Sequence, residues 1–287
     1  MDILKEIFAQ KGFDHFGWAK LETPVSMSYY KNWIQQNYHA DMAYLARHVP
    51  QKENPEMMLA KAKTAFVFAR QYYPHPKSES FPLRNLRVAM YARGKDYHDW
   101  FQEELNDVAQ TLKQKFPEHD FVAFTDSKPV LERDLAFRAG LGWVGKNSCI
   151  INEKRGSLFF IGEIYSTLAV EAQLDMAPDR CGSCTRCIDI CPTNALVEPR
   201  VLDANKCISY WTIEAKKNPP AELSEKFSGW YFGCDLCQSV CPWNQKIFKT
   251  EMQAELKGLD VTSDTLMQNL EKECLLILRA SSEDLKA

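Results

Sequence analysis

At residues 181–192 the chain reads Cys-Gly-Ser-Cys-Thr-Arg-Cys-Ile-Asp-Ile-Cys-Pro, and this stretch decides both its chemistry and the fold of its second half. Cys207 and a shorter copy, Cys234-x2-Cys237-x3-Cys241-Pro242, follow it. Closely spaced thiolates ending in Cys-Pro are typical of proteins that hold two [4Fe-4S] clusters. The spacing therefore predicts single-electron transfer at low potential.

The same spacing predicts which cysteine binds which cluster. In two-cluster modules the fourth cysteine of a run crosses over and binds the other cluster. The first cluster is then expected on Cys181, Cys184, Cys187 and Cys241, and the second on Cys191, Cys207, Cys234 and Cys237.

Structural zinc is the alternative for paired cysteines, but it needs only four ligands. Eight cysteines between residues 181 and 241, with Pro after the last cysteine of both runs, favour iron–sulfur clusters instead. Disulfides are not expected, because nothing else in the chain is typical of a secreted protein.

The overall composition is that of an ordinary globular protein, with 45% hydrophobic and 25% charged residues. The N-terminus lacks a basic, apolar or twin-arginine export pattern, and no apolar run reaches the length of a membrane span, so we expect a cytoplasmic protein. The net charge of −3 excludes a global field that attracts nucleic acid. Basic residues outnumber acidic ones from Lys128 to Arg155, which gives weak support for a local RNA surface.

Hydrophobic periodicity divides the chain into three parts: an α+β body at 1–170, a two-cluster module at 171–248 and a charged helical tail at 249–287. In the body, helices are expected at the N-terminus and over 29–47, 97–116 and 129–139. Strands are expected over 13–21 (bending at Gly17), 64–73, 88–91 and 121–124. A hairpin is expected between 149–152 and 158–166.

Three body segments stand out: 94–98 (Gly-Lys-Asp-Tyr-His), 124–133 and 139–148. Asp126 follows a predicted strand and precedes a helix, where it serves either as an N-cap or as part of a ligand site. The glycines of 140–145 follow a helix rather than a strand, so a dinucleotide site is rejected. His48 and His98 are interpreted as hydrogen-bonded residues, because no second histidine lies one helical turn away.

Taken together, the segments resemble the epoxyqueuosine reductase family of cobalamin-dependent tRNA-modification enzymes. The resemblance runs from about Ile7 to Trp243 and is carried by the three body segments, the cysteine runs and the stretches 156–157, 207–210 and 233–238. It implies a nitroreductase-like cobalamin-binding body, a ferredoxin-like module with two [4Fe-4S] clusters and a short helical C-terminal tail.

The resemblance also implies a chemistry. Base-off cobalamin would lie between body and module and be reduced by the clusters from Co(II) to Co(I), and the epoxide of the tRNA base would lose its oxygen as water. The aspartate that matches Asp126 would donate the proton, with a pKa that we expect burial beside the corrin to raise. Asp134 is interpreted as helix surface.

Further residues carry over by the same resemblance. Cobalamin contacts are expected at Lys52, Asp126, Ile150, Ile161, Ser209, Asp235 and Leu236. Contacts to the tRNA anticodon stem-loop are expected, from charge alone, at Lys146, Arg155, Lys216 and Lys217. Many family members continue into a helical-repeat region that grips tRNA, so residues 249–287 indicate either a short form or a shortened chain.

Two other readings stay open. A corrinoid reductive dehalogenase shares the cofactors but usually carries an export signal. A ferredoxin-like electron carrier would bind no corrinoid and would leave the large body without a role. The electron donor is unidentified, and the family favours a monomer.

Overall fold

The computed structural model describes residues 2–72, 86–93, 95–171 and 176–247. The expected tail and the module's last residue lie outside this range. None of the helices in the described ranges is long and apolar enough to cross a membrane.

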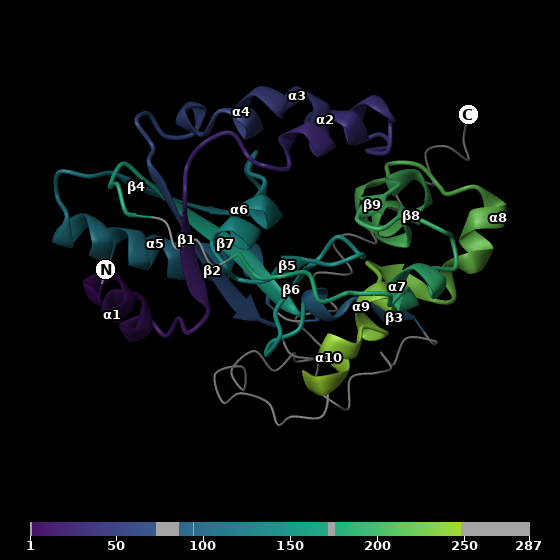
Figure 1. Cartoon of the computed structure of the whole chain (residues 1–287). Helices are drawn as coiled ribbons and strands as arrows, with labels where there is room; N and C mark the ends of the chain where they lie inside the picture. Colours follow the sequence, from purple (N-terminus) through teal and green to yellow (C-terminus); the bar gives the residue numbers. More distant parts are fainter. Residues whose placement is uncertain (1, 73–85, 94, 172–175, 248–287) are drawn as a thin grey trace.

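A four-stranded antiparallel sheet in the order β1-β2-β7-β4 forms the centre of the body (Figure 1). Its registers place Phe16 opposite Phe68, Thr64 opposite Ser166, and Phe121 opposite Ser166. The four strands are β1 (Phe16–Lys20), β2 (Thr64–Gln71), β4 (Phe121–Thr125) and β7 (Phe159–Ser166).

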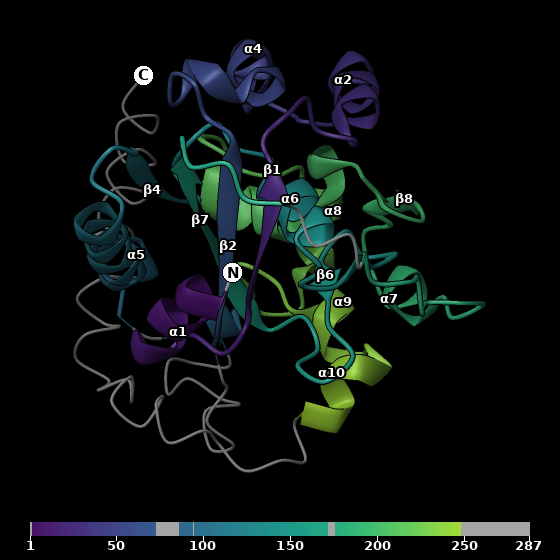
Figure 2. The same ribbon diagram turned by 60° about the vertical axis from the view of Figure 1, so that its left-hand side comes forward.

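Alternating side chains give the sheet two different faces. One face packs against α1 (Asp2–Gln10) and α5 (Tyr97–Lys115), with Phe8, Phe101 and Leu105 fully buried. The other packs against α6 (Glu132–Arg138) and includes Val67. Figure 2 shows α5 and α6 on opposite sides of the strands.

The stretch of chain that connects β1 to β2 forms short helices, which lie along the top of Figure 1. They are α2 (Met27–Gln35), α3 (Ala43–Arg47), α4 (Val49–Glu53) and η1 (Pro55–Met57). The single helix expected over 29–47 is wrong: Asn37 and Ala40 take positive φ values of 56° and 51°, which end α2 and turn the chain.

The second half of the chain folds as short elements around the cysteines. They are α7 (Arg186–Asp189), β8 (Leu196–Glu198), β9 (Val201–Leu202), η3 (Ala204–Lys206), the π-helix η4 (Tyr210–Glu214), α8 (Ala221–Ser224), η5 (Glu225–Phe227), β10 (Trp230–Phe232), α9 (Leu236–Ser239) and α10 (Pro242–Ile247).

This half is joined to the body by strand pairing and by side chains. β3 (Arg87–Val88), which precedes η2 (Met90–Ala92), pairs in parallel with β10. Trp143 and Trp243 pack edge to face, with ring centroids 5.2 Å apart. The cluster loops are therefore held against the edge of the body from which the residues around 90 and 143 come.

Several expected boundaries need correction. β1 does not bend at Gly17, which pairs in register with Val67. α6 begins at Glu132, so Pro129 lies in the preceding loop rather than in the first turn. The expected strand over 88–91 is β3 followed by the turn of η2. β6 (Ile150–Ile151) pairs with β5 (Trp143–Val144) rather than with β7, so the expected hairpin is wrong apart from an Asn152–Gly156 bridge.

Candidate active site

Four thiols line one cavity at the junction of body and module. The cavity has a volume of about 250 Å³, and its walls include Lys146, Asn147, Arg180 and Arg186. The cysteines that line it are Cys181, Cys184, Cys187 and Cys241. Cys241 thus comes to the first three cysteines from the far end of the motif.

The other four cysteines form a second group. The pKa of the Cys234 thiol is raised to about 12, first by burial and then by the neighbouring Cys207 and Cys191. Burial also raises the pKa of Cys237, and Cys234 and Cys207 are among the neighbouring thiols that raise it. The structure therefore brings Cys191, Cys207, Cys234 and Cys237 together.

The described residues include no group of three His, Cys, Asp or Glu side chains arranged around a single metal ion. A cubane does not need such convergence, because each thiolate bonds a different iron atom. The two groups of four thiols fit two cubanes.

Asp126 lies where β4 ends, on a loop that leads to α6. Its φ of 28° is a backbone conformation that residues with a side chain rarely adopt. The Tyr97 hydroxyl donates to Asp126 Oδ2 over 2.6 Å, and His98 Nε2 lies 3.1 Å from the same oxygen. His98 is held from its other side, where Nδ1 lies 2.7 Å from Asp96 Oδ1.

These contacts fix the protonation of the group. The hydrogen bond from His98 lowers the pKa of Asp126, against the opposing effect of burial. The bond to Asp126 raises the pKa of His98 to about 9. At neutral pH the site therefore holds an Asp126 carboxylate and a His98 imidazolium, so the expectation that burial raises the pKa of Asp126 is wrong for this structure.

Two further glutamates lie near Asp126: Glu132, which is partly buried, and Glu163, which is fully buried. Burial raises the pKa of Glu132 to about 8 with a further contribution from the Asp126 charge, while a hydrogen bond from the Asp126 backbone N–H opposes the rise. Glu163 on β7 is fully buried, and neither of its carboxyl oxygens has a hydrogen-bond partner within the described structure. Burial raises its pKa well above the ordinary value, and Glu132 raises it further.

Lys52 is a cation whose pKa is influenced by all three of these acidic residues. It is buried, its Nζ donates to Val130 O over 3.0 Å, and burial lowers its pKa. The charges of Glu132, Glu163 and Asp126 each raise the pKa of Lys52 and so oppose the effect of burial.

The remaining residues expected at cobalamin fall into two places. Ile150 and Ile161 both belong to the hydrophobic cluster on the α6 face of the sheet. Ser209, Asp235 and Leu236 lie in the module, where the buried Asp235 accepts the Met90 N–H over 2.6 Å and Leu236 packs near Trp230.

Asp134 is not a surface residue, as the sequence had suggested. It is 5% exposed, accepts the Ser26 N–H over 2.8 Å, and pairs with Arg138 over 2.7 Å. Its role is to fix α6 against the segment before α2.

Sequence reasoning missed the residues that face Asp126 from other segments. Burial raises the pKa of Glu214 in η4, and the Asp126 charge raises it further. The Asp126 charge also contributes to the raised pKa of Tyr44 in α3, and Tyr44 hydrogen-bonds to Glu214. Residues of α3, η4 and the Asp126 loop therefore lie close enough to influence one another's pKa, although nothing in the local sequence of α3 or η4 indicates this.

Of the basic residues expected at RNA, three are engaged within the protein. Lys146 Nζ donates to backbone carbonyls of the cluster loop, Arg155 pairs with Asp14 over 2.8 Å, and Lys217 pairs with Asp41 over 2.8 Å. Lys216 is exposed.

Comparisons with known proteins agree with these two parts. The profile described as "4Fe-4S double cluster binding domain" matches residues 180–244, and that described as "Epoxyqueuosine reductase QueG, DUF1730" matches residues 52–127. An epoxyqueuosine reductase of Cyclobacterium marinum is 40% identical over 247 residues, which cover 85% of this chain and 78% of the relative.

Solved structures give the same result. A Bacillus subtilis epoxyqueuosine reductase, described as having its catalytic aspartate loop swung out of the active site, matches with a TM-score of 0.78 and 28% identity over 92% of this chain and 70% of its own. An epoxyqueuosine reductase with a modified tRNA-Tyr stem loop matches with a TM-score of 0.76 and 29% identity, covering 92% of this chain and 69% of its own.

An α+β body joined to a double-cluster module defines an iron–sulfur oxidoreductase. The relatives narrow this class, and the chain belongs to the epoxyqueuosine reductase family.

Proposed function

We propose that this chain reduces epoxyqueuosine in tRNA to queuosine, with two [4Fe-4S] clusters feeding cobalamin and with Asp126 delivering a proton. The observation that carries the proposal is the group formed by Tyr97, His98 and Asp126, which keeps a proton on His98 directly beside the half-exposed Asp126 carboxylate. The names of the relatives, and the tRNA stem loop bound by one of them, support the substrate.

The residues around Asp126 fit cobalamin. Ile161 is only partly buried and packs against the hydrophobic cluster that contains Ile150, so it offers apolar surface on this face of the sheet, which suits a flat macrocycle. Glu163 lies two residues from Ile161 on that face, and its carboxyl oxygens, which have no hydrogen-bond partner among the described residues, suit a ligand rimmed by amide donors. Asp126 and Lys52 would hold it from the body, and Ser209, Asp235 and Leu236 from the module. When bound, cobalamin supplies low-potential electron transfer to the epoxide carbon.

The protein's own part is proton delivery. Removing the epoxide oxygen as water and leaving an alkene consumes two electrons and two protons, and the departing oxygen must be protonated. Tyr97 and His98 both bind Oδ2 of Asp126. We assign Oδ1 to the substrate, and the His98 imidazolium supplies the proton that Asp126 passes on.

The other proposals follow the family. We propose a nitroreductase-like body at 1–170, a ferredoxin-like module at 171–248, a tail at 249–287, and a cytoplasmic monomer that takes electrons from a separate low-potential donor. Lys216 and Lys217 remain our candidates for phosphate contacts, which would make tRNA binding salt-sensitive.

The test is an anaerobic turnover assay. The chain, reconstituted with iron, sulfide and cobalamin, is given a chemical reductant and tRNA that bears epoxyqueuosine. Mass spectrometry of the digested nucleosides should show the loss of one oxygen, dependent on cobalamin. Asp126→Asn should lower the rate by roughly 10²-fold or more, because it removes the group that passes on the proton.

Asp120→Asn is the matched control. Asp120 lies just before β4, where its carboxylate pairs with Lys113 on the surface, so its loss should leave turnover unchanged. Full turnover by Asp126→Asn would disprove the role of Asp126. Failure of the wild-type chain to bind cobalamin would instead disprove the cofactor and favour an electron carrier.

A further inference from the structure

The segment Val144–Asn147, which we name the link segment, connects the body to both cysteine groups. Lys146 makes the first connection. Its Nζ donates to Gly182 O over 2.6 Å and to Cys184 O over 3.0 Å, and both carbonyls lie in the first cysteine loop. These two hydrogen bonds fix the Lys146 side chain against the first cysteine loop.

Asn147 makes the second connection. It is 5% exposed, and its Nδ2 donates to Cys237 O over 3.3 Å. Its Oδ1 accepts the Cys149 N–H over 3.2 Å, which fixes the orientation of the amide. Adjacent residues of the link segment therefore hold the backbone of a ligand from each of the two groups.

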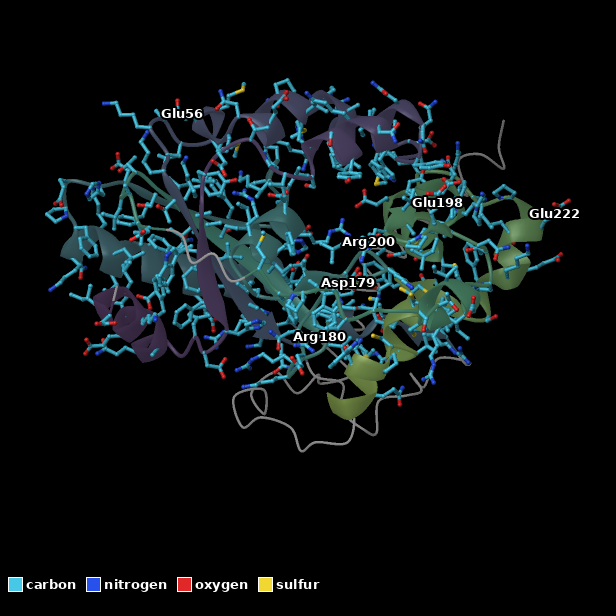
Figure 3. All side chains as sticks on the ribbon, viewed as in Figure 1. Glu56, Asp179, Arg180, Glu198, Arg200 and Glu222 are labelled. Carbon is cyan, nitrogen blue, oxygen red and sulfur yellow. The ribbon has the colours of Figure 1, made fainter. Side chains whose placement is uncertain are left out.

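Arg200 makes a third connection. Its Nε donates to Val144 O and its backbone N–H donates to Lys146 O, each over 2.9 Å. Its guanidinium pairs with Asp179, which accepts the Cys181 N–H over 2.8 Å. Figure 3 labels Arg200 and Asp179 at the centre of the molecule, between the sheet and the cluster loops.

The shape of the link segment depends on glycine. A Cβ on Gly145 would lie 2.4 Å from Ile151 Cδ1 and 2.7 Å from Asn147 Oδ1, and one on Gly142 would lie 2.2 Å from Ile151 O. The turn is thus packed too tightly for side chains at these two positions, which keeps Lys146 and Asn147 facing the module.

The charge of Lys146 matters as well as its hydrogen bonds. Together with Arg180 and Arg186 it lines the cavity that holds Cys181, Cys184, Cys187 and Cys241. A cubane on four thiolates is an anion, and reduction makes it more negative. A nearby cation favours the reduced state, and net charge is one of the factors that set cluster potentials.

We propose that Lys146 is a positioning residue that fixes the first cluster loop to the body and raises the reduction potential of the cluster held there. Asn147 holds the loop of the second cluster in the same way. The proposal concerns how electrons reach the site, and it rests on the two clusters rather than on the proposed substrate.

The experiment measures the clusters alone. The full chain is reconstituted anaerobically with iron and sulfide, without cobalamin or tRNA, and both midpoint potentials are read by EPR-monitored redox titration. Lys146→Gln should lower the potential of one cluster more than that of the other, with iron content unchanged. Lys146→Arg should keep the wild-type value, because it retains the charge.

Lys115→Gln is the matched control, since it removes the same charge from the exposed end of α5. This helix packs on the face of the sheet opposite to the one that contacts the link segment. Unchanged potentials in Lys146→Gln, with full iron, would overturn the proposal. Loss of iron from Lys146→Gln but not from Lys146→Arg would support the anchoring role, and loss from both would overturn the charge argument. Because turnover is not measured, failure here is distinct from failure of the proposed function.

Discussion

At the scale of single residues, His98 is the residue whose role in the structure differs most from its interpretation in the sequence. It lies between two carboxylates, 2.7 Å from Asp96 and 3.1 Å from Asp126, and it is therefore charged at neutral pH. An imidazolium beside a carboxylate can return a proton to Asp126 after each turnover. A neutral histidine cannot.

The pKa of His98 gives a prediction with a definite sign. Because its folded-state pKa of about 9 lies above the ordinary 6.5, its contribution to stability is complete below pH 6.5 and is lost as the pH rises through 9. The thermal midpoint of wild type should therefore exceed that of His98→Gln at pH 6, and the difference should vanish by about pH 10. Turnover by wild type should decline over the same alkaline range.

His119→Gln is the control, because His119 pairs with Glu118 within the described structure and lies just before β4, at the opposite end of that strand from Asp126. It should leave the alkaline decline in place. A His98→Gln variant with the wild-type pH profile and rate would show that His98 is not the proton source.

At the scale of elements, the loop from Asp126 to α6 depends on Glu132. The Glu132 carboxyl accepts the backbone N–H of Asp126, which holds a strained residue in place from the first turn of the following helix. The Bacillus subtilis relative, with its aspartate loop swung out, shows that such a loop has a second position in that protein.

Glu132→Ala should therefore release the loop, at a cost of about 1 kcal/mol for the lost hydrogen bond. The backbone amides of residues 126–128 and 130–131 should exchange faster with deuterium, and turnover should fall while iron content stays constant. Glu132→Gln keeps an acceptor oxygen and should lie between wild type and alanine. Equal protection of these amides in all three proteins would show that Glu132 does not hold the loop.

Gly17 gives a prediction about the close packing of β1 and α6. A Cβ at this position would lie 2.0 Å from the Ala139 carbonyl oxygen, a backbone atom that cannot move without shifting the end of α6. Gly17→Ala should destabilise the protein by about 2 kcal/mol or more, measured by denaturant unfolding. Lys20→Ala, at the exposed end of the same strand, should stay within about 0.5 kcal/mol.

The elements that sequence predicts well are those whose own periodicity is strong. α1, β2, α5 and β4 appear close to their expected places because each has a buried stripe or alternation of its own. The split between α2 and α3 and the pairing of β5 with β6 were missed, because each depends on tertiary contacts rather than on local pattern.

The site divides in the same way. Cysteine spacing indicates the clusters because ligand spacing is local chemistry. The segments that contain His98 and Asp126 stand out in the sequence, but their contact spans 28 residues and nothing local predicts it. Glu163 is hidden for another reason, since a single acid in an aromatic and apolar strand carries no pattern that marks it as buried.

At the scale of the whole molecule, the question is what holds the module against the body. Asn244 in α10 is the clearest answer, because it is fully buried and saturated with hydrogen bonds. Its Oδ1 accepts the Ser157 N–H over 2.7 Å, and its Nδ2 donates to Ser157 Oγ over 2.9 Å and to Gln238 O over 2.8 Å. One side chain thus joins the loop before β7, α9 and α10.

Asn244→Leu keeps the branched shape of this side chain but leaves the buried Ser157 N–H without its acceptor, at a cost of about 1–3 kcal/mol. Because Asn244 lies one helical turn after Cys241, the loss should loosen the cluster on Cys241 before the other. Iron analysis and EPR after mild chelation should show one cluster lost early, whereas Gln245→Leu, exposed on the same helix, should behave as wild type. Equal loss of both clusters would mean that Asn244 stabilises the module as a whole rather than the contact between the module and the body.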